Sequence, residues 1–240
     1  MTPNEFRRYA LFYLGYYGAL GAYTPYVSRW VDSLGHGAYV IGTVLALWYG
    51  GRILAPPAWS RLTAASAAPG RWLVGGCVLA TAGFATLGGA PPLAWMLGAM
   101  LWFALFFNAV MPQFEAMTLS TLGANNHAYG SIRVWGSIGF LIVAGTYGWL
   151  LDRFGDGVFV WLTVPWLALT AAAAWLHRDD PPVPKPDPGP REPLWRRLGT
   201  KRLLGTVMLM QVGFGPFYVF YTLHLRAHGH DGTAVGALWA

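Results

Sequence analysis

Charged residues are scarce in this sequence. Only 11% of its 240 residues are Asp, Glu, Lys or Arg, whereas a soluble domain carries about a quarter. Hydrophobic residues make up 55% of the chain, and tryptophan alone occurs 13 times. A single soluble core of this size cannot bury so much apolar surface. The composition therefore excludes an ordinary soluble domain and predicts an integral membrane protein whose main partner is the lipid bilayer.

Cysteine is nearly absent, and acidic residues are few. Cys77 is the one cysteine and lies in an apolar run, which excludes a disulfide framework and predicts a packing role. Ten acidic residues stand against 16 basic ones, and the isoelectric point is near 9.6. The basic residues occupy short gaps between apolar runs and form no single patch. This distribution indicates membrane topology as the reason for the charge and argues against a nucleic-acid partner.

The sequence offers no strong metal or cofactor site. His224, His228 and His230 have a spacing that a metal could use, but only Asp231 lies near them. We interpret them as solvated histidines, and we expect neither a metal nor a cofactor.

Seven apolar segments are long enough to be membrane-spanning helices, which need about 20 residues. Turn sequences rich in Gly, Pro and Asp separate them. Arg7 and Arg8 precede the first segment as in a signal peptide, but that segment is too long and others follow, so we expect it to be retained. An eighth segment begins near Thr233 and is too short to cross. The seven segments span residues 9–31, 39–60, 72–90, 93–119, 131–151, 158–176 and 203–225.

The basic residues predict the orientation of these helices, because Lys and Arg accumulate in cytoplasmic loops. With the N-terminus inside, the outer loops contain only Arg29, Arg153 and Arg226. We therefore expect a multi-pass protein of a bacterial-type inner (plasma) membrane with a cytoplasmic N-terminus. The cytoplasmic set is Arg7, Arg8, Arg61, Arg71, Arg178, Lys185, Arg191, Arg196, Arg197, Lys201 and Arg202.

A proline-rich stretch divides the chain. It predicts an extended cytoplasmic linker at 177–202 between a six-helix unit, 1–176, and the start of a second unit, 203–240. Residues 23–46 and 217–240 also align without gaps, with Gly35-His36 on Gly229-His230. Together these features favour two parallel six-helix halves, of which the second is incomplete.

Glu115 is the strongest single indication of a functional site. A carboxylate in hydrocarbon costs roughly 2.5 kcal/mol or more, so such groups usually have a function. Asn108 lies seven residues earlier on the same helix face, with Pro112 between them, whereas Gln113 points elsewhere. Two alternatives remain open: Glu115 meets water at the helix end, and Pro112, like Pro25 in the first segment, is an ordinary proline of a membrane helix.

Arg133 opens the fifth segment, where Gly136 and Gly139 allow close helix contact. Adjacent antiparallel helices joined by a short loop would bring Arg133 to the level of Glu115, and pairing lowers the cost of burying both charges. The alternative is an interfacial arginine that reaches the headgroups.

The spacing Pro112-x-x-Glu115-Ala116, followed by Tyr129-Gly130-x-x-Arg133-x-Trp135-Gly136-Ser137-x-Gly139-Phe140, resembles the major facilitator superfamily. The closer likeness is to its phenylpropionate permease-like group and to the oligosaccharide–proton symporters. The resemblance implies an all-α membrane fold: a six-helix N-terminal half plus the first one to two helices of the second half. It also implies a Glu115–Arg133 charge pair in the substrate site and an aromatic contact from Phe140. One departure is the second connection, residues 59–65, which lacks the acid usual in this superfamily.

Two further residues are candidates for the site. Arg52 lies in mid-helix one turn after Trp48, and it is either a second anion contact or a structural partner of another helix. Tyr17 belongs to an aromatic stripe with Tyr13 and Tyr16, and such stripes pack more often than they bind ligands.

The sequence therefore favours a secondary active transporter, monomeric when full length, that is not an enzyme. Proton-coupled symport of a small organic solute is the expected mode, with an aromatic carboxylate first and a sugar or nucleoside next. Efflux by antiport is the alternative. A membrane-embedded enzyme or a non-transporting sensor is the alternative of another class, but no G-x-S-x-G or H-E-x-x-H motif is present.

Overall fold

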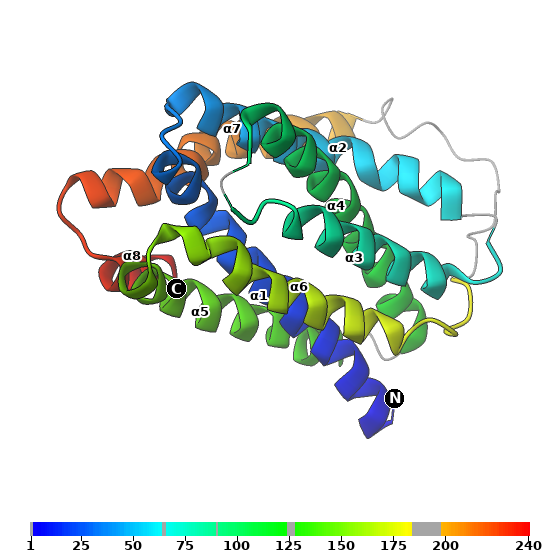
Figure 1. The fold of residues 1–240 in the computed structure, drawn as a ribbon. Coiled ribbons are helices and arrows are strands. Elements are labelled where there is room, and N and C mark those ends of the chain that lie inside the picture. Colours follow the sequence, from blue (N-terminus) through cyan, green and yellow to red (C-terminus); the bar gives the residue numbers. More distant parts are fainter. Residues whose placement is uncertain (1, 64–65, 90, 124–127, 184–197) are drawn as a thin grey trace.

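The computed structural model describes residues 2–63, 66–89, 91–123, 128–183 and 198–240 (Figure 1). All regular secondary structure in these ranges is helical. A short 3-10 helix, η2 (Asp156–Val158), follows the fifth long helix. The α-helices are α1 (Pro3–Ser33), α2 (Ala38–Thr63), α3 (Pro69–Ala85), α4 (Leu93–Leu122), α5 (Tyr129–Phe154), α6 (Phe159–Trp175), α7 (Leu198–Ala227) and α8 (Gly232–Trp239).

The seven long helices confirm the seven predicted segments, although several are longer than the apolar runs that predict them. The largest correction concerns α7, which begins at Leu198 and so includes the last five residues of the predicted linker. These residues, 198–202, form helix because backbone hydrogen bonding does not require an apolar sequence. Residues 184–197 of the predicted linker lie outside the described ranges, and the division at 176 and 203 remains a prediction.

By length and composition, five helical segments within the described ranges are able to cross a membrane: α2, α4, α5, Asp156–Trp175 and α7. The structure explains why α1 is not among them. Its many tyrosines lower its hydropathy, but most of its side chains are buried by other helices. A helix enclosed in protein does not need a lipid-compatible surface. Helix α3 has only 17 residues.

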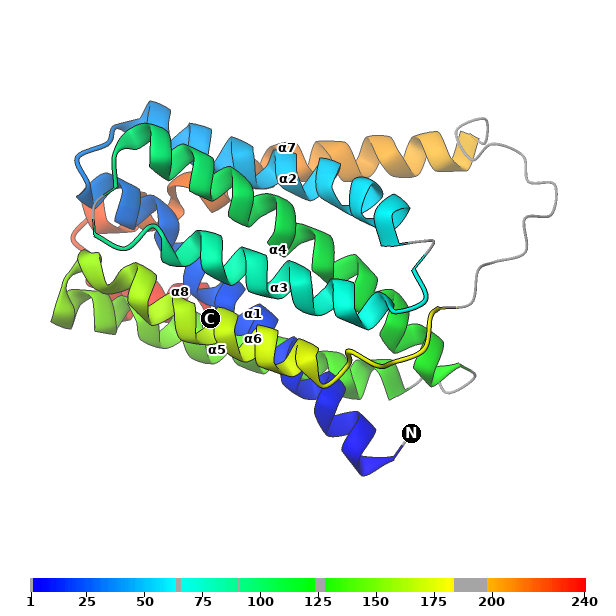
Figure 2. The ribbon, with the colours of Figure 1, turned by 45° about the vertical axis from the view of Figure 1, so that its right-hand side comes forward.

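Helix α1 lies at the centre of the bundle, where glycines allow it to approach α5 and α6 closely (Figures 1 and 2). Gly139 of α5 lies against the backbone of Leu14, and Gly18 of α1 lies beneath the ring of Trp166 in α6. A β-carbon at either glycine would collide with its neighbour. On the other sides, α3 packs on α4 and α6, and α2 packs on α4.

The α1–α2 and α7–α8 connections share one turn geometry. Gly35 has φ +82° and Gly229 has φ +83°, a left-handed conformation that favours glycine. These two positions are aligned by the internal sequence match. The two helical hairpins therefore share a left-handed glycine at the position where the internal sequence match aligns them.

The molecule has two distinct ends. The N-terminus and the start of α7 lie at one end, here called the N-terminal end (Figure 2). The turns between α1 and α2 and between α7 and α8 lie at the other, here called the opposite end (Figure 2).

Candidate functional site

A cavity of about 250 Å³ lies between α1, α2 and α4. It brings together four of the six predicted site residues, which come from three different helices. Aromatic side chains form much of the remaining wall, so the cavity combines one acid, one base and one amide with several rings. Its lining is Tyr16, Tyr17, Leu20, Trp48, Arg52, Pro56, Asn108, Met111, Pro112 and Glu115.

Glu115 lies two turns inside α4, half-buried, and Pro112 lines the same cavity without breaking the helix. The hydroxyl of Tyr129, at the start of α5, donates a long hydrogen bond of 3.5 Å to the Glu115 carboxylate. Asn108 is buried, and its amide donates to the carbonyl of Ala104 at 2.8 Å. Asn108, Pro112 and Glu115 thus share the cavity side of α4.

Arg133 is arranged differently from the prediction. Among the described residues it forms no ion pair with Glu115. Its guanidinium carbon instead lies 3.8 Å from the ring centroid of Tyr17, which is a cation–π contact. Gly136 makes this contact possible, because a β-carbon there would lie 2.8 Å from the Arg133 Nη1 atom.

The reason for the missing ion pair is the packing order of the helices. The prediction assumes that α4 and α5 are neighbours, but α5 packs mainly on α1, and it touches α4 little. Tyr17 of α1 contacts Arg133 and also lines the cavity that holds Glu115. The arginine is therefore next to the cavity wall and is not part of the lining.

Arg52 has an exposed side chain and forms no ion pair with a carboxylate of the described residues. It also lines a second cavity of about 500 Å³ between α2 and α7, together with Tyr49, Gln211 and Tyr218. Arg52 thus stands where the two cavities meet.

Phe140 does not line the cavity around Glu115. It is half-buried on α5, and its backbone lies against Gly21 of α1. The aromatic contact that the resemblance implies for this residue therefore has no counterpart in the lining, where Tyr16, Tyr17 and Trp48 supply the rings.

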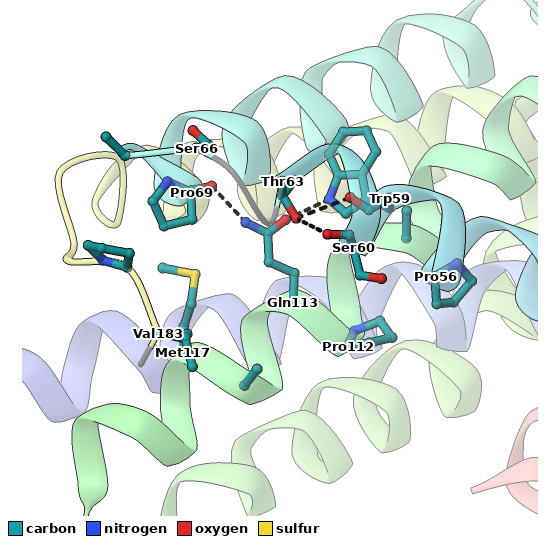
Figure 3. A pocket seen from close by; sticks show the side chains of 14 residues that line it. Pro56, Trp59, Ser60, Thr63, Ser66, Pro69, Pro112, Gln113, Met117 and Val183 are labelled. Carbon is teal, nitrogen blue, oxygen red and sulfur yellow. Dashed lines mark hydrogen bonds between the residues drawn. The ribbon is translucent and has the colours of Figure 1, made fainter. Parts of the chain in front are cut away.

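Gln113 faces away from Glu115, as predicted, into another cavity of about 500 Å³ (Figure 3). The indole Nε1 of Trp59 donates to its Oε1 at 2.6 Å, and its Nε2 donates to the carbonyl of Pro69 at 2.6 Å. Gln113 therefore joins α4 to α2 and α3 near the connection that lacks the usual acid. Neutral hydrogen bonds tie these helices together here.

A cluster of charges at the opposite end was missed by the sequence analysis. Arg29 of α1 is only 3% exposed, and its guanidinium lies 2.8 Å from Asp152 and 2.5 Å from Asp156. Arg226 of α7 lies 3.7 Å from Asp156. From the sequence these residues read as loop charges, because nothing local shows that four elements, α1, α5, η2 and α7, converge there.

Helix packing reinforces this cluster. Gly148 of α5 and Gly232 of α8 are in backbone contact, and the Gly232 amide donates to Asp152 at 2.5 Å. The hydroxyl of Thr222 in α7 donates to the carbonyl of Pro25 at 2.5 Å. In contrast, residues 201–214 of α7 are exposed. Helices α7 and α8 therefore contact α1 and α5 at the opposite end, and the exposed first part of α7 stands apart from them at the N-terminal end.

Comparison with known proteins assigns this arrangement. A protein of Escherichia coli (strain K12) that is named "Probable 3-phenylpropionic acid transporter" is 28% identical to this chain over 256 residues. The alignment covers 100% of this chain and 64% of that protein. Maltose permease of Geobacillus stearothermophilus is 28% identical over 173 residues, covering 71% of this chain and 43% of the permease. The chain thus spans less than two thirds of the length of either relative.

Solved structures share the fold at low sequence identity. The nucleoside transporter NupG gives a TM-score of 0.73 at 10% identity, covering 92% of this chain and 57% of that one. A bacterial homologue of the human lysosomal transporter Spinster, inward-facing and unoccupied, gives 0.70 at 17% identity, covering 99% and 59%. The family model described as the MFS_1 like family matches residues 6–240. The chain therefore belongs to this family of the major facilitator superfamily, as the resemblance in its motifs predicts.

Proposed function

We propose that this protein is a secondary active transporter that takes up a small aromatic carboxylate together with a proton. In this proposal the N-terminal end faces the cytoplasm of a bacterial inner membrane. The relatives support the class of activity, since one is named for 3-phenylpropionic acid and another for maltose. The contact of the helices at the opposite end supports a cavity that is reached from the N-terminal end.

The observation that carries the proposal is the chemistry of the cavity around Glu115. The rings of Tyr16, Tyr17 and Trp48 offer flat apolar surfaces, and the guanidinium of Arg52 has no carboxylate partner in the described chain. Guanidinium groups bind carboxylates by paired hydrogen bonds, and aromatic rings pack against other rings. An aromatic acid satisfies both features at once.

The same cavity offers a reason for proton coupling. Arg52 and Glu115 both line it, so their charges already balance. An anionic substrate would add a second negative charge close to Glu115, and two like charges at short distance repel each other. If Glu115 accepts a proton as the substrate binds, the anionic substrate and the proton together add no net charge to the cavity. The proton and the anion would therefore bind together, with Glu115 as the proton carrier and Arg52 as the anion contact.

Uptake into proteoliposomes tests the proposal. The full-length protein should accumulate radiolabelled 3-phenylpropionate when the outside is acidic, and Glu115→Gln should abolish the dependence on the pH gradient. Arg52→Gln should weaken binding roughly ten- to hundredfold, because a charged hydrogen bond contributes about 1.5–3 kcal/mol. Arg61→Gln, an exposed position on the same helix, is the matched control. Gradient-independent uptake by the unmodified protein would exclude symport.

A sugar is the second candidate, and the aromatic walls also favour it, because sugar rings stack on aromatic faces. Maltose and a nucleoside belong in the same uptake panel. Uptake of either one that survives Arg52→Gln, without uptake of the aromatic acid, would reassign the substrate class.

A further inference from the structure

A buried histidine lies at the N-terminal end, outside the cavity described above. His177 is the second residue after α6, and its side chain is 0% exposed. Its ring centroid lies 4.5 Å from that of Tyr9 in α1 and 5.1 Å from that of Phe114 in α4. Gly70 of α3 lies against its backbone carbonyl. Three helices therefore enclose the first turn of the connection that leads towards α7.

The polar contacts of His177 come from one side only. Its Nδ1 lies 2.7 Å from the Asp180 carboxylate and 3.4 Å from a guanidinium nitrogen of Arg8. Asp180 also forms an ion pair of 2.5 Å with Arg8. The other ring nitrogen, Nε2, is buried and has no hydrogen-bond partner among the described residues.

This geometry fits a neutral imidazole. With a proton on Nδ1, the ring donates to Asp180, and Nε2 keeps only a lone pair towards the aromatic rings. A second proton would place an N–H without an acceptor between Tyr9 and Phe114, and would add a positive charge beside Arg8. A buried donor without a partner costs about 1–3 kcal/mol, and more when it is charged. Exposure to water would remove this cost.

We propose that His177 is a pH-sensitive anchor. It holds the residues that follow α6 against α1 and α4 while its ring is neutral, and it releases them when the ring takes up a proton. Val183 lines the cavities next to Gln113 and next to Arg8, so release of the segment opens both. The anchor would respond to acid at the N-terminal end, independently of the substrate.

The direction of the pH effect follows from the surroundings. Burial lowers the pKa of the His177 imidazole below its usual 6.5, although Asp180 acts to raise it. The released ring therefore binds a proton more readily than the packed ring does. The packed form is fully stabilised above about pH 6.5 and loses stability as the pH falls below that value.

The ring of His177 is surrounded by groups from α1, α3, α4 and its own segment, and only some of these groups carry a charge or titrate. Helix α1 contributes Arg8 and Tyr9, and the segment itself contributes Asp180. Helix α4 contributes Phe114, and also Thr121, which hydrogen-bonds to Tyr9; neither side chain titrates. Helix α3 contributes Gly70. Asp180 is paired with Arg8, and the histidine is the group whose change of charge the proposal invokes.

Distance measurement between two spin labels tests the anchor. The labels replace Leu119 on α4 and Val183 in the segment, both exposed, in a full-length chain carrying Cys77→Ala. We expect one narrow distance at pH 8 and a longer, broader distribution at pH 5, with a midpoint below 6.5. His177→Phe keeps the ring packing but cannot take up a proton, so its distances should stay the same at both pH values. His36→Gln, at the opposite end, should respond as the unmodified protein does.

Two results would overturn the proposal. One is a distance in the unmodified protein that does not change between pH 8 and pH 5, a result that does not depend on whether any histidine variant folds. The other is a folded His177→Phe variant whose distances change with pH as the unmodified protein's do, since the response would then belong to another group.

Discussion

Arg133 shows how a charge can act on a cavity that it does not line. Its guanidinium stacks on the ring of Tyr17, and the same ring forms part of the cavity wall. A cation over a tyrosine contributes about 0.5–2 kcal/mol, more when water is excluded. We therefore expect Arg133 to fix the position of Tyr17 and, through the positive charge behind that ring, to favour an anion in the cavity.

For this reason Arg133→Ala should weaken substrate binding by the full-length protein roughly two- to thirtyfold while membrane insertion remains intact. Equilibrium binding of radiolabelled 3-phenylpropionate measures the affinity for substrate, and recovery of the variant in the membrane fraction measures insertion. Arg153→Ala, an exposed arginine near the end of the same helix, should bind normally. Wild-type affinity in Arg133→Ala would remove this residue from the site.

Gly136 is the residue that allows this stack. A β-carbon at this position would lie 2.7 Å from the Tyr17 ring as well as close to Arg133. Gly136→Ala should therefore lower the free energy of unfolding by about 1–3 kcal/mol, the usual effect of overpacking. Gly130→Ala on the same helix meets open space and should have little effect. Thermal unfolding in detergent compares the two; equal melting temperatures would show that the stack adapts.

At the scale of elements, the crossing of α5 and α8 depends on small residues. Gly148 and Gly232 touch through their backbones, and Gly236 lies against the carbonyl of Gly145. Glycines at such spacing let membrane helices approach closely. Gly148→Leu should force the helices apart and lower the melting temperature, whereas Gly98→Leu, which meets open space, should not. An unchanged melting temperature in Gly148→Leu would mean that this contact contributes no stability.

The sequence predicts the helices well and their neighbours poorly. Apolar runs are a local property, so α2, α4 and α5 could be located from composition alone. Helix ends that leave the apolar run, such as residues 198–202 of α7, have no such signal. The neighbours of α5 depend on which glycines face which helix, and this is why the predicted Glu115–Arg133 pair is wrong in its geometry.

The sequence likewise predicts some residues of the candidate site and the charged clusters, and misses others. Glu115, Asn108 and Arg52 were predicted because polar groups are rare in apolar helices, and they do share one cavity. The cluster around Arg29 was missed because Asp152 and Asp156 stand in a turn sequence, where charges are ordinary. His177 was missed because it begins a stretch that reads as an exposed linker.

At the scale of the whole molecule, contacts between α7–α8 and the first six helices gather at the opposite end. The cavity around Glu115 should therefore be reached from the N-terminal end only. A cysteine at Leu20, in a chain carrying Cys77→Ala, should react with an impermeant maleimide from the N-terminal side of sealed vesicles. A cysteine at Ser33, exposed at the opposite end, should react from the other side. Labelling of the Leu20 position from both sides would contradict closure.

The burial of α1 also has a consequence for biosynthesis. This helix is synthesised before the helices that enclose it, and its tyrosines make it a weak candidate for insertion into lipid by itself. Its neighbours α5 and α6 are synthesised more than a hundred residues later. We therefore expect helix α1 to take its final place only after those partners have been synthesised, which would make its placement a late step in assembly.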